Sequence, residues 1–510
     1  MAVNGSAQRA LTSNTSRMVP SVHKVTPSIW RARVESARTD VTPIQEKGAV
    51  MDWRLNYDLV VIGSGAAGHH GAIQGAKLGK RVAAIEVGTS LGGATINTGT
   101  VPSKTVREAV IRAGSTSTNI ADRIAQVASN ESAVYANQFR RNGIDLFAGE
   151  ASFISPNLIQ VKNSDECTLI EGDRILIATG SRPAHNPKIP VDGVAVFDTD
   201  AIRNLPPPKR VLTIVGGGVI GAEYACIAAE AGAIVTLIER RPRMLDFIDG
   251  ELVEALSYHM RRKGVMFRLG EEVDSVIRNS GGKVCAALKS GKPVWSDGLL
   301  YAVGRQGNTE SLNLAAARLE ADERGRIRVN DRFQTEQPHI YAAGDVIGFP
   351  SLASVSMEQG RVAVCYAFGE AAQSVPDLFP YGIFTIPEIS FVGKTEEQLT
   401  QEAIPYEIGI ARYQEIARGQ ILGDTTGLLK LLFHRETLRL LGVHIIGEGA
   451  TELIHIGQAV MGLEGSIKFL LTTVFNYPTL AECYKVAALN GVNRLDYPGK
   501  PAKGVEYASR

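Results

Sequence analysis

Two glycine-rich turns carry the clearest chemical signal in this sequence. The first spans residues 63–68 (GSGAAG); it follows an apolar run typical of a strand buried on both faces and precedes a helical pattern. Gly63 permits a tight turn, Gly65 lets backbone approach a pyrophosphate, and Gly68 allows the helix to pack closely on the strand. Glu86 ends the next strand and can accept hydrogen bonds from ribose hydroxyls. This order predicts a dinucleotide at the start of the helix.

The same pattern returns further along the chain. Gly216, Gly218 and Gly221 take the three glycine positions of a second turn, GGGVIG, and Glu239 ends the strand that follows. Two such units predict two bound dinucleotides. Hydride chemistry then requires that one is a flavin and the other a nicotinamide.

The charges after the second unit give opposing indications of nucleotide preference. Glu239 should bind a ribose hydroxyl and repel a 2′-phosphate, which favours NAD. Arg240, Arg241 and Arg243 follow directly. They are either a solvated charge cluster or contacts for the 2′-phosphate, which would favour NADP. An enzyme that accepts both nucleotides in turn has reason to keep both signals, so we expect both to bind, with Arg241 as the phosphate contact.

The elements around these turns predict an α/β protein with two doubly wound dinucleotide-binding domains. A run of three prolines at 206–208 marks a linker before the pattern restarts. From about residue 378, alternating strands and helices predict an antiparallel α+β domain. The predicted segments are an extension at 1–56, a first dinucleotide-binding part at 57–190, a second dinucleotide-binding domain at 191–307, a central segment at 308–377 and a C-terminal domain at 378–510.

The first 50 residues are basic, with five Lys or Arg before the first acid at Glu35. This composition fits an organelle transit peptide, an unstructured tail, or a reading frame that truly begins at Met51. A second stretch, 211–238, is apolar enough to suggest a membrane span, but Glu223 and Glu230 interrupt it. Its glycine pattern predicts a buried strand, turn, helix and strand instead.

The composition excludes several classes of function. The chain has 510 residues, 44% of them hydrophobic and 21% charged, as in globular proteins with several domains. A net charge of +1 gives no reason to expect nucleic acid or an anionic membrane as a partner. The five cysteines are widely scattered, so they predict neither a disulfide framework nor a metal site. A reducing, cytoplasmic setting fits best, or an organelle if the extension is a transit peptide.

Further motifs resemble one family. The segments GGATINTGTVPSK at 92–104, ATG at 178–180, VGR at 303–305 and AAGD at 342–345 are similar to those of the two-dinucleotide disulfide-reductase flavoproteins. The resemblance runs from about Tyr57 to Leu495. It implies FAD on the first turn, NAD or NADP on the second, and Lys104 beside the reactive flavin nitrogen with Glu223 as its acidic partner. It also implies a set of further cofactor contacts: Gly92, Gly93, Ala94, Thr95, Thr179, Gly180, Gly304, Gly344 and Asp345.

The chain departs from the family where thiol chemistry takes place. Family members carry two cysteines at the positions of Thr95 and Thr100, and threonine cannot pass electrons as a thiol. Near the C-terminus the family has a histidine as acid or base with a glutamate behind it; here Tyr477 takes the histidine's place and Glu482 keeps the glutamate. The resemblance implies a homodimer in which these two residues approach the flavin of the other subunit.

One branch of the family, the soluble pyridine nucleotide transhydrogenases, shares the strings GTVPSK, GDVIGFPSLAS and NYPTLAECYKVAALNGVNR. This resemblance implies hydride exchange between NADPH and NAD through FAD, with the nucleotides using one site in turn. Two alternatives stay open. One is an NAD(P)H:quinone or diaphorase-type reductase, and the other is a catalytically silent flavin-binding redox sensor.

Overall fold

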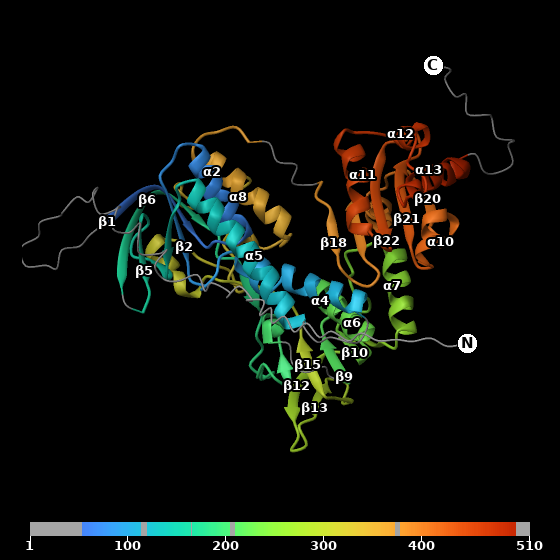
Figure 1. The fold of residues 1–510 in the computed structure, drawn as a ribbon, viewed down its shortest axis with the longest axis horizontal. Coiled ribbons are helices and arrows are strands. Elements are labelled where there is room, and N and C mark those ends of the chain that lie inside the picture. Colours follow the sequence, from blue (N-terminus) through green and yellow to red (C-terminus); the bar gives the residue numbers. More distant parts are fainter. Residues whose placement is uncertain (1–53, 114–119, 165, 205–209, 373–377, 496–510) are drawn as a thin grey trace, which may run out of the picture.

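The computed structural model describes residues 54–113, 120–164, 166–204, 210–372 and 378–495. Three lobes are visible in Figure 1: a lobe around β1 and α2, a lobe around β9 and β15, and a lobe around β22 and α11. The predicted extension at 1–56 lies outside the described residues up to residue 53. Its last three residues are an exception, because the first strand begins at Arg54 rather than at Tyr57.

A mostly parallel sheet forms the first lobe, and its strands follow the order β3-β2-β1-β6-β5-β4. β17 lies outside this order and pairs in parallel with the C-terminal end of β6. β2 is buried along its whole length, and the C-terminal ends of β1 and β6 are apolar and buried beside it. Only β4 and β5 run antiparallel to their neighbours. The strands are β1 (Arg54–Ile62), β2 (Val82–Glu86), β3 (Asp145–Ala148), β4 (Glu150–Phe153), β5 (Leu158–Lys162), β6 (Cys167–Ile177) and β17 (Ile340–Ala342).

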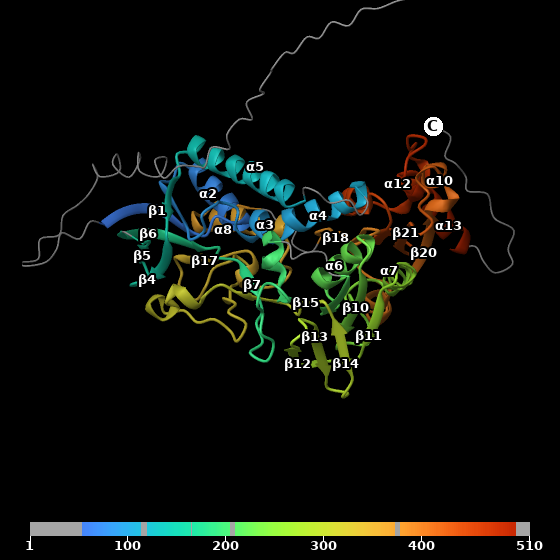
Figure 2. The ribbon, with the colours of Figure 1, turned by 60° about the horizontal axis from the view of Figure 1, so that its bottom comes forward.

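Helices α2 (Ala66–Lys77) and α8 (Ala353–Ala367) pack together against this sheet. Gly360 makes that contact possible, because a Cβ there would lie 2.0 Å from the carbonyl oxygen of Ala67. Figure 2 shows α5 and α4 following one another along one side of the molecule, with α3 below them and α4 extending toward the other two lobes. These helices are α3 (Gly93–Asn97), α4 (Thr100–Ala113) and α5 (Ile120–Arg141).

The second lobe repeats the plan of the first. Its parallel sheet has the order β11-β10-β9-β15-β8, so the first strand is again flanked by the second strand and by a strand from much later in the chain. A small antiparallel sheet, β12-β13-β14, covers one end. The elements are β8 (Val196–Phe197), β9 (Val211–Val215), α6 (Val219–Glu230), β10 (Ile234–Glu239), α7 (Gly250–Arg262), β11 (Met266–Leu269), β12 (Val273–Arg278), β13 (Val284–Leu288), β14 (Pro293–Ser296) and β15 (Gly298–Tyr301).

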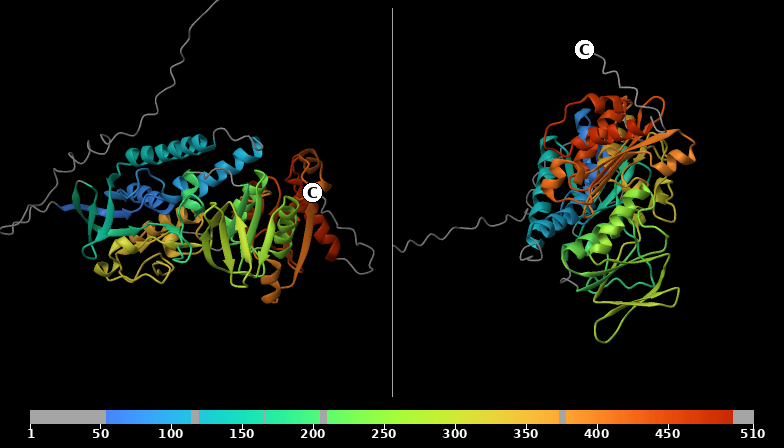
Figure 3. Two further views of the ribbon diagram at one scale, coloured as in Figure 1. Left: turned by 90° about the horizontal axis from the view of Figure 1, so that it is seen from below. Right: turned by 90° about the vertical axis from the view of Figure 1, so that its right-hand side faces the viewer.

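The third lobe is an antiparallel sheet, β18-β19-β22-β21-β20, with helices α11 and α13 packed on it. This is the α+β domain that the sequence predicts, and Figure 3 shows it beside the second lobe. Its elements are β18 (Tyr381–Ile383), β19 (Ile389–Gly393), α9 (Glu396–Gln401), β20 (Tyr406–Arg412), α10 (Ala417–Leu422), β21 (Leu428–His434), β22 (Leu440–Ile446), α11 (Ala450–Gly462), α12 (Ile467–Thr472) and α13 (Glu482–Leu495).

The second and third lobes share one apolar core. The cluster that holds Leu252 and Leu256 of α7 also contains Ile383, Leu428 and Ile446 of the antiparallel sheet, all nearly inaccessible to solvent. Buried side chains from both lobes therefore form one continuous apolar core at the junction, as they do inside a single domain.

A buried lysine lies at the same junction. Lys430 of β21 is 1% exposed and forms ion pairs with Asp249 at 2.8 Å, with Glu251 at 3.2 Å and with Glu396. The three carboxylates come close enough together to suggest a cation site. The lysine ammonium already supplies that positive charge, so the cluster is an ionic contact between α7, α9 and β21 rather than a metal site.

Candidate active site

The first glycine turn has the geometry that a dinucleotide needs. Gly63 has φ +102°, and a Cβ there would lie 2.4 Å from the carbonyl oxygen of Ala178 at the end of β6. A Cβ on Gly68 would lie 1.8 Å from the carbonyl oxygen of Gly63. Gly65 is different: its Cβ would meet only Gly93, at 3.8 Å. The protein's own packing therefore leaves the position of Gly65 open, as close approach of a pyrophosphate requires.

Glu86 is held at the end of β2 by this turn. Its Oε2 accepts hydrogen bonds from the Ser64 amide at 3.0 Å and the Ser64 hydroxyl at 2.5 Å, and its Oε1 accepts one from the Gly88 amide at 2.7 Å. The Ser64 hydroxyl also accepts from the amide of Gly92, the left-handed residue before α3. Ser64, which the sequence analysis did not single out, thus links the turn, the acid and the segment of Gly92, Gly93, Ala94 and Thr95.

Asp345 lies just after β17 and Gly344. Its Oδ2 accepts a hydrogen bond from the Ser181 hydroxyl at 2.6 Å. Arg305 holds that serine, donating to its hydroxyl at 2.8 Å and to its carbonyl oxygen at 2.6 Å. Thr179 follows β6 directly, before Gly180, and its buried hydroxyl has no partner among the described residues. A free buried hydroxyl beside an anchored carboxylate fits a polar ligand.

The second turn repeats the geometry of the first. A Cβ on Gly216 would lie 2.3 Å from the carbonyl oxygen of Ala302, and one on Gly221 would lie 1.8 Å from that of Gly216. A Cβ on Gly218 would meet nothing within 4 Å. The open central glycine, beside Gly304 (φ +131°) in the loop after β15, again leaves room for a pyrophosphate.

Lys104 and Glu223 form the ion pair that the sequence predicts. The Lys104 ammonium lies 2.8 and 2.7 Å from the two carboxylate oxygens, which joins α4 to α6. Glu223 is 5% exposed at its side chain and Lys104 24%. The amide of Phe384, from the third lobe, also donates to Glu223 at 2.9 Å. All three lobes therefore position this pair, and Phe384 is a contributor that sequence patterns could not indicate.

A second contact fixes the same junction. Arg107, one turn after Lys104, is 3% exposed and donates to the carbonyl oxygen of Thr385 at 3.0 Å. It also pairs with Glu388 at 3.3 Å. The carbonyl next to Phe384 is thus tied to α4, which keeps the Phe384 amide at Glu223.

The three arginines after β10 have different surroundings. Arg241 donates to both oxygens of Glu239, at 2.9 and 3.1 Å, and to Asp246 at 2.5 Å. Arg243 forms an ion pair with Glu397 at 3.3 Å, which links the second lobe to the third. Arg240 is exposed. Burial alone would raise the pKa of Glu239, but hydrogen bonds from Arg241 and from the Gly217 amide lower it.

No cysteine lies where a dithiol would be. Thr95 is in α3 and Thr100 begins α4, between the first turn and Lys104. Four of the five cysteines are buried elsewhere and Cys167 is exposed on β6. Burial raises the pKa of Cys226 and of Cys483 to about 12, which keeps both as unreactive thiols.

Tyr477 and Glu482 lie in the third lobe, before and at the start of α13. Tyr477 is 69% exposed, and the apolar side chains of Val474 and Phe469, from the segment just before it, are exposed as well. One carboxylate oxygen of Glu482 is buried with no partner among the described residues. An apolar face with an unpaired carboxylate is what a surface that meets a second subunit would present.

His69 of α2 is a packing residue. Its ring stacks on Tyr135 with the centroids 3.7 Å apart, and burial, followed by the charge of His70, lowers its pKa to about 4. The ring is therefore neutral at physiological pH and fills the space between α2 and α5.

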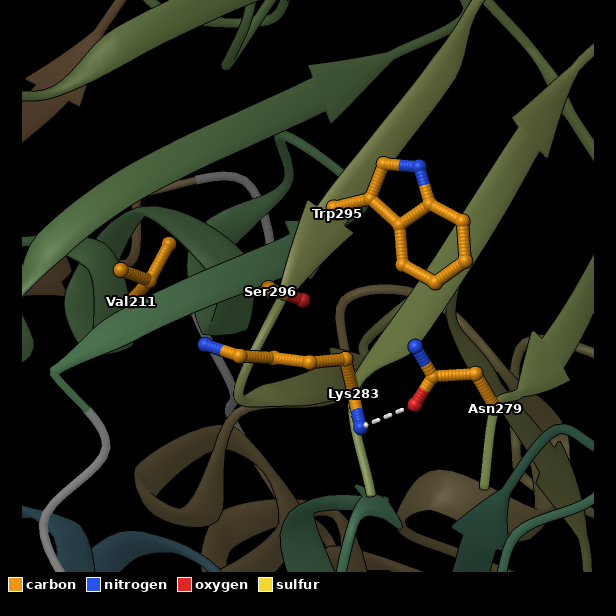
Figure 4. A pocket seen from close by; sticks show the side chains of 5 residues that line it. All are labelled: Val211, Asn279, Lys283, Trp295 and Ser296. Carbon is orange, nitrogen blue, oxygen red and sulfur yellow. Dashed lines mark hydrogen bonds between the residues drawn. The ribbon is translucent and has the colours of Figure 1, made fainter. Parts of the chain in front are cut away.

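A pocket of about 310 Å³ opens where β9 meets the small sheet of the second lobe, lined by Val211, Asn279, Lys283, Trp295 and Ser296. Figure 4 shows Trp295 and Lys283 at its rim. Val211 is the first residue of β9, whereas the glycine turn follows the last. Because ligands of such sheets bind at the carboxyl ends of the strands, this pocket lies at the wrong end for the nucleotide.

Two dinucleotide-binding lobes with a lysine–glutamate pair between them define a class: the oxidoreductases that use a flavin together with a pyridine nucleotide. Comparison with known proteins places the chain within that class. Residues 57–360 match the family model of the pyridine nucleotide-disulphide oxidoreductases, and residues 379–488 match the dimerisation domain of the same family. The chain belongs to this family.

Bacterial proteins are among its relatives. The chain is 50% identical over 458 residues to the soluble pyridine nucleotide transhydrogenase of Mycobacterium tuberculosis (86% of this chain, 98% of the relative). It is 45% identical over 461 residues to that of Photobacterium profundum (86% and 98%). Among solved structures, the HOCl-induced flavoprotein disulfide reductase RclA from Escherichia coli is similar with a TM-score of 0.80 and 29% identity, covering 85% of this chain and 99% of RclA.

Family membership confirms several predictions at once. The protein is an oxidoreductase that uses FAD and a pyridine nucleotide, and its C-terminal domain makes it a homodimer. The predicted fold class is confirmed as well. No helix in the described part of the chain is long and apolar enough to span a membrane.

Proposed function

We propose that the protein transfers hydride from NADPH to NAD⁺ through FAD, the two nucleotides using the second glycine turn one after the other. The similarity to the relatives named transhydrogenase extends over 98% of the length of each relative. The observation that carries the proposal is the combination of an intact Lys104–Glu223 pair with threonines at positions 95 and 100. The flavin site keeps its electrostatic residue but has no dithiol to receive the electrons.

In this proposal FAD, when bound, takes hydride from one nucleotide and gives it to the next. Gly63, Gly65 and Gly68 bring backbone amides to its pyrophosphate, and Glu86 accepts from its ribose. Asp345, held by Ser181, binds a hydroxyl of the chain between ring and phosphate. Lys104, oriented by Glu223, stabilises negative charge on the reduced ring.

The nicotinamide dinucleotides are assigned to the second turn. Gly216, Gly218 and Gly221 admit the pyrophosphate, and Glu239 accepts from the adenosine ribose. Arg241 supplies the charge for a 2′-phosphate. With one such turn in the sequence, the two nucleotides must alternate, which requires that the first product leaves before the second substrate binds.

We extend the proposal to the domain limits, the partner subunit and the location. The flavin-binding part comprises 57–190 and 308–377, and the nicotinamide-binding part 191–307. Tyr477 and Glu482 are proposed to approach the flavin of the partner, because their exposed apolar surroundings suit an interface. A cytoplasmic location fits the bacterial relatives, and an organelle is the alternative if the basic extension directs import.

Anaerobic reduction of the yellow holoenzyme tests the proposal. NADPH should bleach the flavin, and after removal of NADP⁺ an equivalent of NAD⁺ should restore the yellow colour with formation of NADH. Recovery of colour only with a quinone would replace the proposal by the NAD(P)H:quinone reductase alternative. If neither NADPH nor NADH bleaches the flavin, the catalytically silent redox sensor becomes the remaining alternative.

A further inference from the structure

Arg241 is shared by three acidic oxygens on two residues. Its Nε and one terminal nitrogen bind Glu239, and its other terminal nitrogen binds Asp246. Glu239 also accepts from the Gly217 amide at 2.6 Å, so it is fixed against the glycine turn. Three of the five guanidinium N–H groups are therefore engaged by the two carboxylates, and one N–H remains on each terminal nitrogen.

Asp246 is fixed in place by the fold. The residue before it, Leu245, is fully buried, has φ 47°, and donates its amide to the carbonyl oxygen of Gly217 at 3.0 Å. The carbonyl oxygen of Asp246 accepts from Arg243 at 2.9 Å, and Arg243 is itself tied to Glu397. The next residue, Phe247, lies against Tyr381 with the ring centroids 5.5 Å apart. The third lobe and the glycine turn therefore set the position of the Asp246 carboxylate.

The Arg241–Asp246 pair can still be opened by a ligand. The side chains are 36% and 46% exposed, while that of Glu239 is 5% exposed. An adenosine 2′-phosphate replaces the ribose hydroxyl that an acid in the position of Glu239 binds, so it must come close to Arg241. A dianionic phosphate would then compete with Asp246 for the hydrogen bond that Arg241 donates. The negative charge of the Asp246 carboxylate would also repel the phosphate.

We propose that Asp246 is a specificity-determining residue that competes with the nucleotide 2′-phosphate for Arg241. With NADH the guanidinium stays between Glu239 and Asp246. With NADPH the guanidinium turns from Asp246 toward the phosphate, so part of the phosphate's binding energy is used to break that ion pair. The competition weakens the binding of the nucleotide that carries the 2′-phosphate relative to the one that lacks it. This inference rests on the proposed function, in which one site accepts both.

Asp246→Asn in the FAD-loaded enzyme tests the competition. An exposed ion pair is worth up to about 1 kcal/mol, or about fivefold in affinity, and loss of repulsion acts in the same direction. The ratio of the Kd for NAD⁺ to the Kd for NADP⁺, measured by calorimetry on the resting enzyme, should rise roughly 5-fold. The matched control is Asp274→Asn: Asp274 is 49% exposed and pairs with Lys188 on the same lobe, and its replacement removes the same charge.

Arg241→Ala supplies the second arm. Alone it should weaken NADP⁺ by roughly 10- to 150-fold, the loss of a hydrogen bond to a charged group. In that background Asp246→Asn should change the Kd ratio by less than about twofold, because no guanidinium remains to compete for and the direct repulsion between exposed charges is screened by salt. A double-mutant cycle on the Kd ratio therefore reports coupling between the two residues.

Three results would overturn the inference: a ratio that Asp246→Asn leaves unchanged, a ratio that it lowers, or a rise that persists without Arg241. A lowered ratio would mean that Asp246 holds Arg241 ready for the phosphate. Binding on the resting enzyme does not depend on hydride exchange. An enzyme that binds both nucleotides but cannot exchange hydride would refute the proposed function and leave the inference standing. If the wild type binds no NADP⁺, the inference requires that Asp246→Asn creates that binding.

Discussion

Replacing Lys104 by Met should lower the reduction potential of the bound flavin. The Lys104 ammonium is held 2.7 Å from Glu223 at the junction of the three lobes, and in the proposed function it stabilises the negative charge of the reduced ring. An interaction with a charged group is worth about 1.5–3 kcal/mol. For a two-electron couple about 30 mV corresponds to 1.4 kcal/mol, so the midpoint potential should fall by roughly 30–65 mV.

Glu223→Gln should shift the potential in the opposite direction. Without the carboxylate the Lys104 charge is less compensated, so the reduced flavin is stabilised and the potential rises. The double variant, Lys104→Met with Glu223→Gln, removes a neutral pair and should lie close to the wild type.

Anaerobic titration against redox dyes measures all three potentials, and circular dichroism checks that each variant is folded. Lys188→Met is the control, because Lys188 is 67% exposed on the second lobe. A shift below about 10 mV in folded Lys104→Met, or shifts of the same sign in both single variants, would refute the electrostatic role of the pair.

Three further outcomes are expected. Gly65→Val should fold, because the protein leaves room for a Cβ there, yet purify without flavin; Gly218→Val should keep the flavin but lose nicotinamide binding, and flavin content with calorimetry distinguishes the two. Glutathione disulfide and dihydrolipoamide should be inert in steady-state assays, since no dithiol is present; turnover comparable to nicotinamide exchange would contradict this. Lys430→Met should lower stability by about 3–5 kcal/mol by leaving Asp249 unpaired, and adding Asp249→Asn should restore part of it in denaturant unfolding.

The sequence was sufficient where a short segment carries the whole signal. Gly63 and Gly216, with the acids Glu86 and Glu239, sit within single strand–turn–helix units, so local spacing was enough to predict their geometry. The Lys104–Glu223 pair came from the family resemblance, since 119 positions separate the two residues. The structure shows the tight turns at Gly63 and Gly216 and the ion pair between Lys104 and Glu223.

Other contacts depend on topology that spacing does not encode. Ser181 meets Asp345 because β6 and β17, which precede the two residues, are neighbours in one sheet. Arg305 meets Ser181 because β16 (Arg305–Gly307) pairs with β7 (Ser181–Pro183). Arg243 resembles Arg241 in sequence, but its partner Glu397 lies in another lobe, and nothing in the local pattern distinguishes the two. Charged side chains on turns are the hardest to assign, because their partners are set by packing far along the chain.

The apolar core that the second and third lobes share has a consequence for how this protein can be altered or recombined. The second lobe is not an interchangeable module, because Ile383, Leu428 and Ile446 complete its interior from a different part of the chain. A chimera that exchanged only residues 191–307 would bring a foreign α7 against a native sheet and leave mismatched volumes on both sides. Designs that alter nucleotide use by grafting should therefore move α7 together with β18, β21 and β22, or confine themselves to substitutions in the loop between β10 and α7.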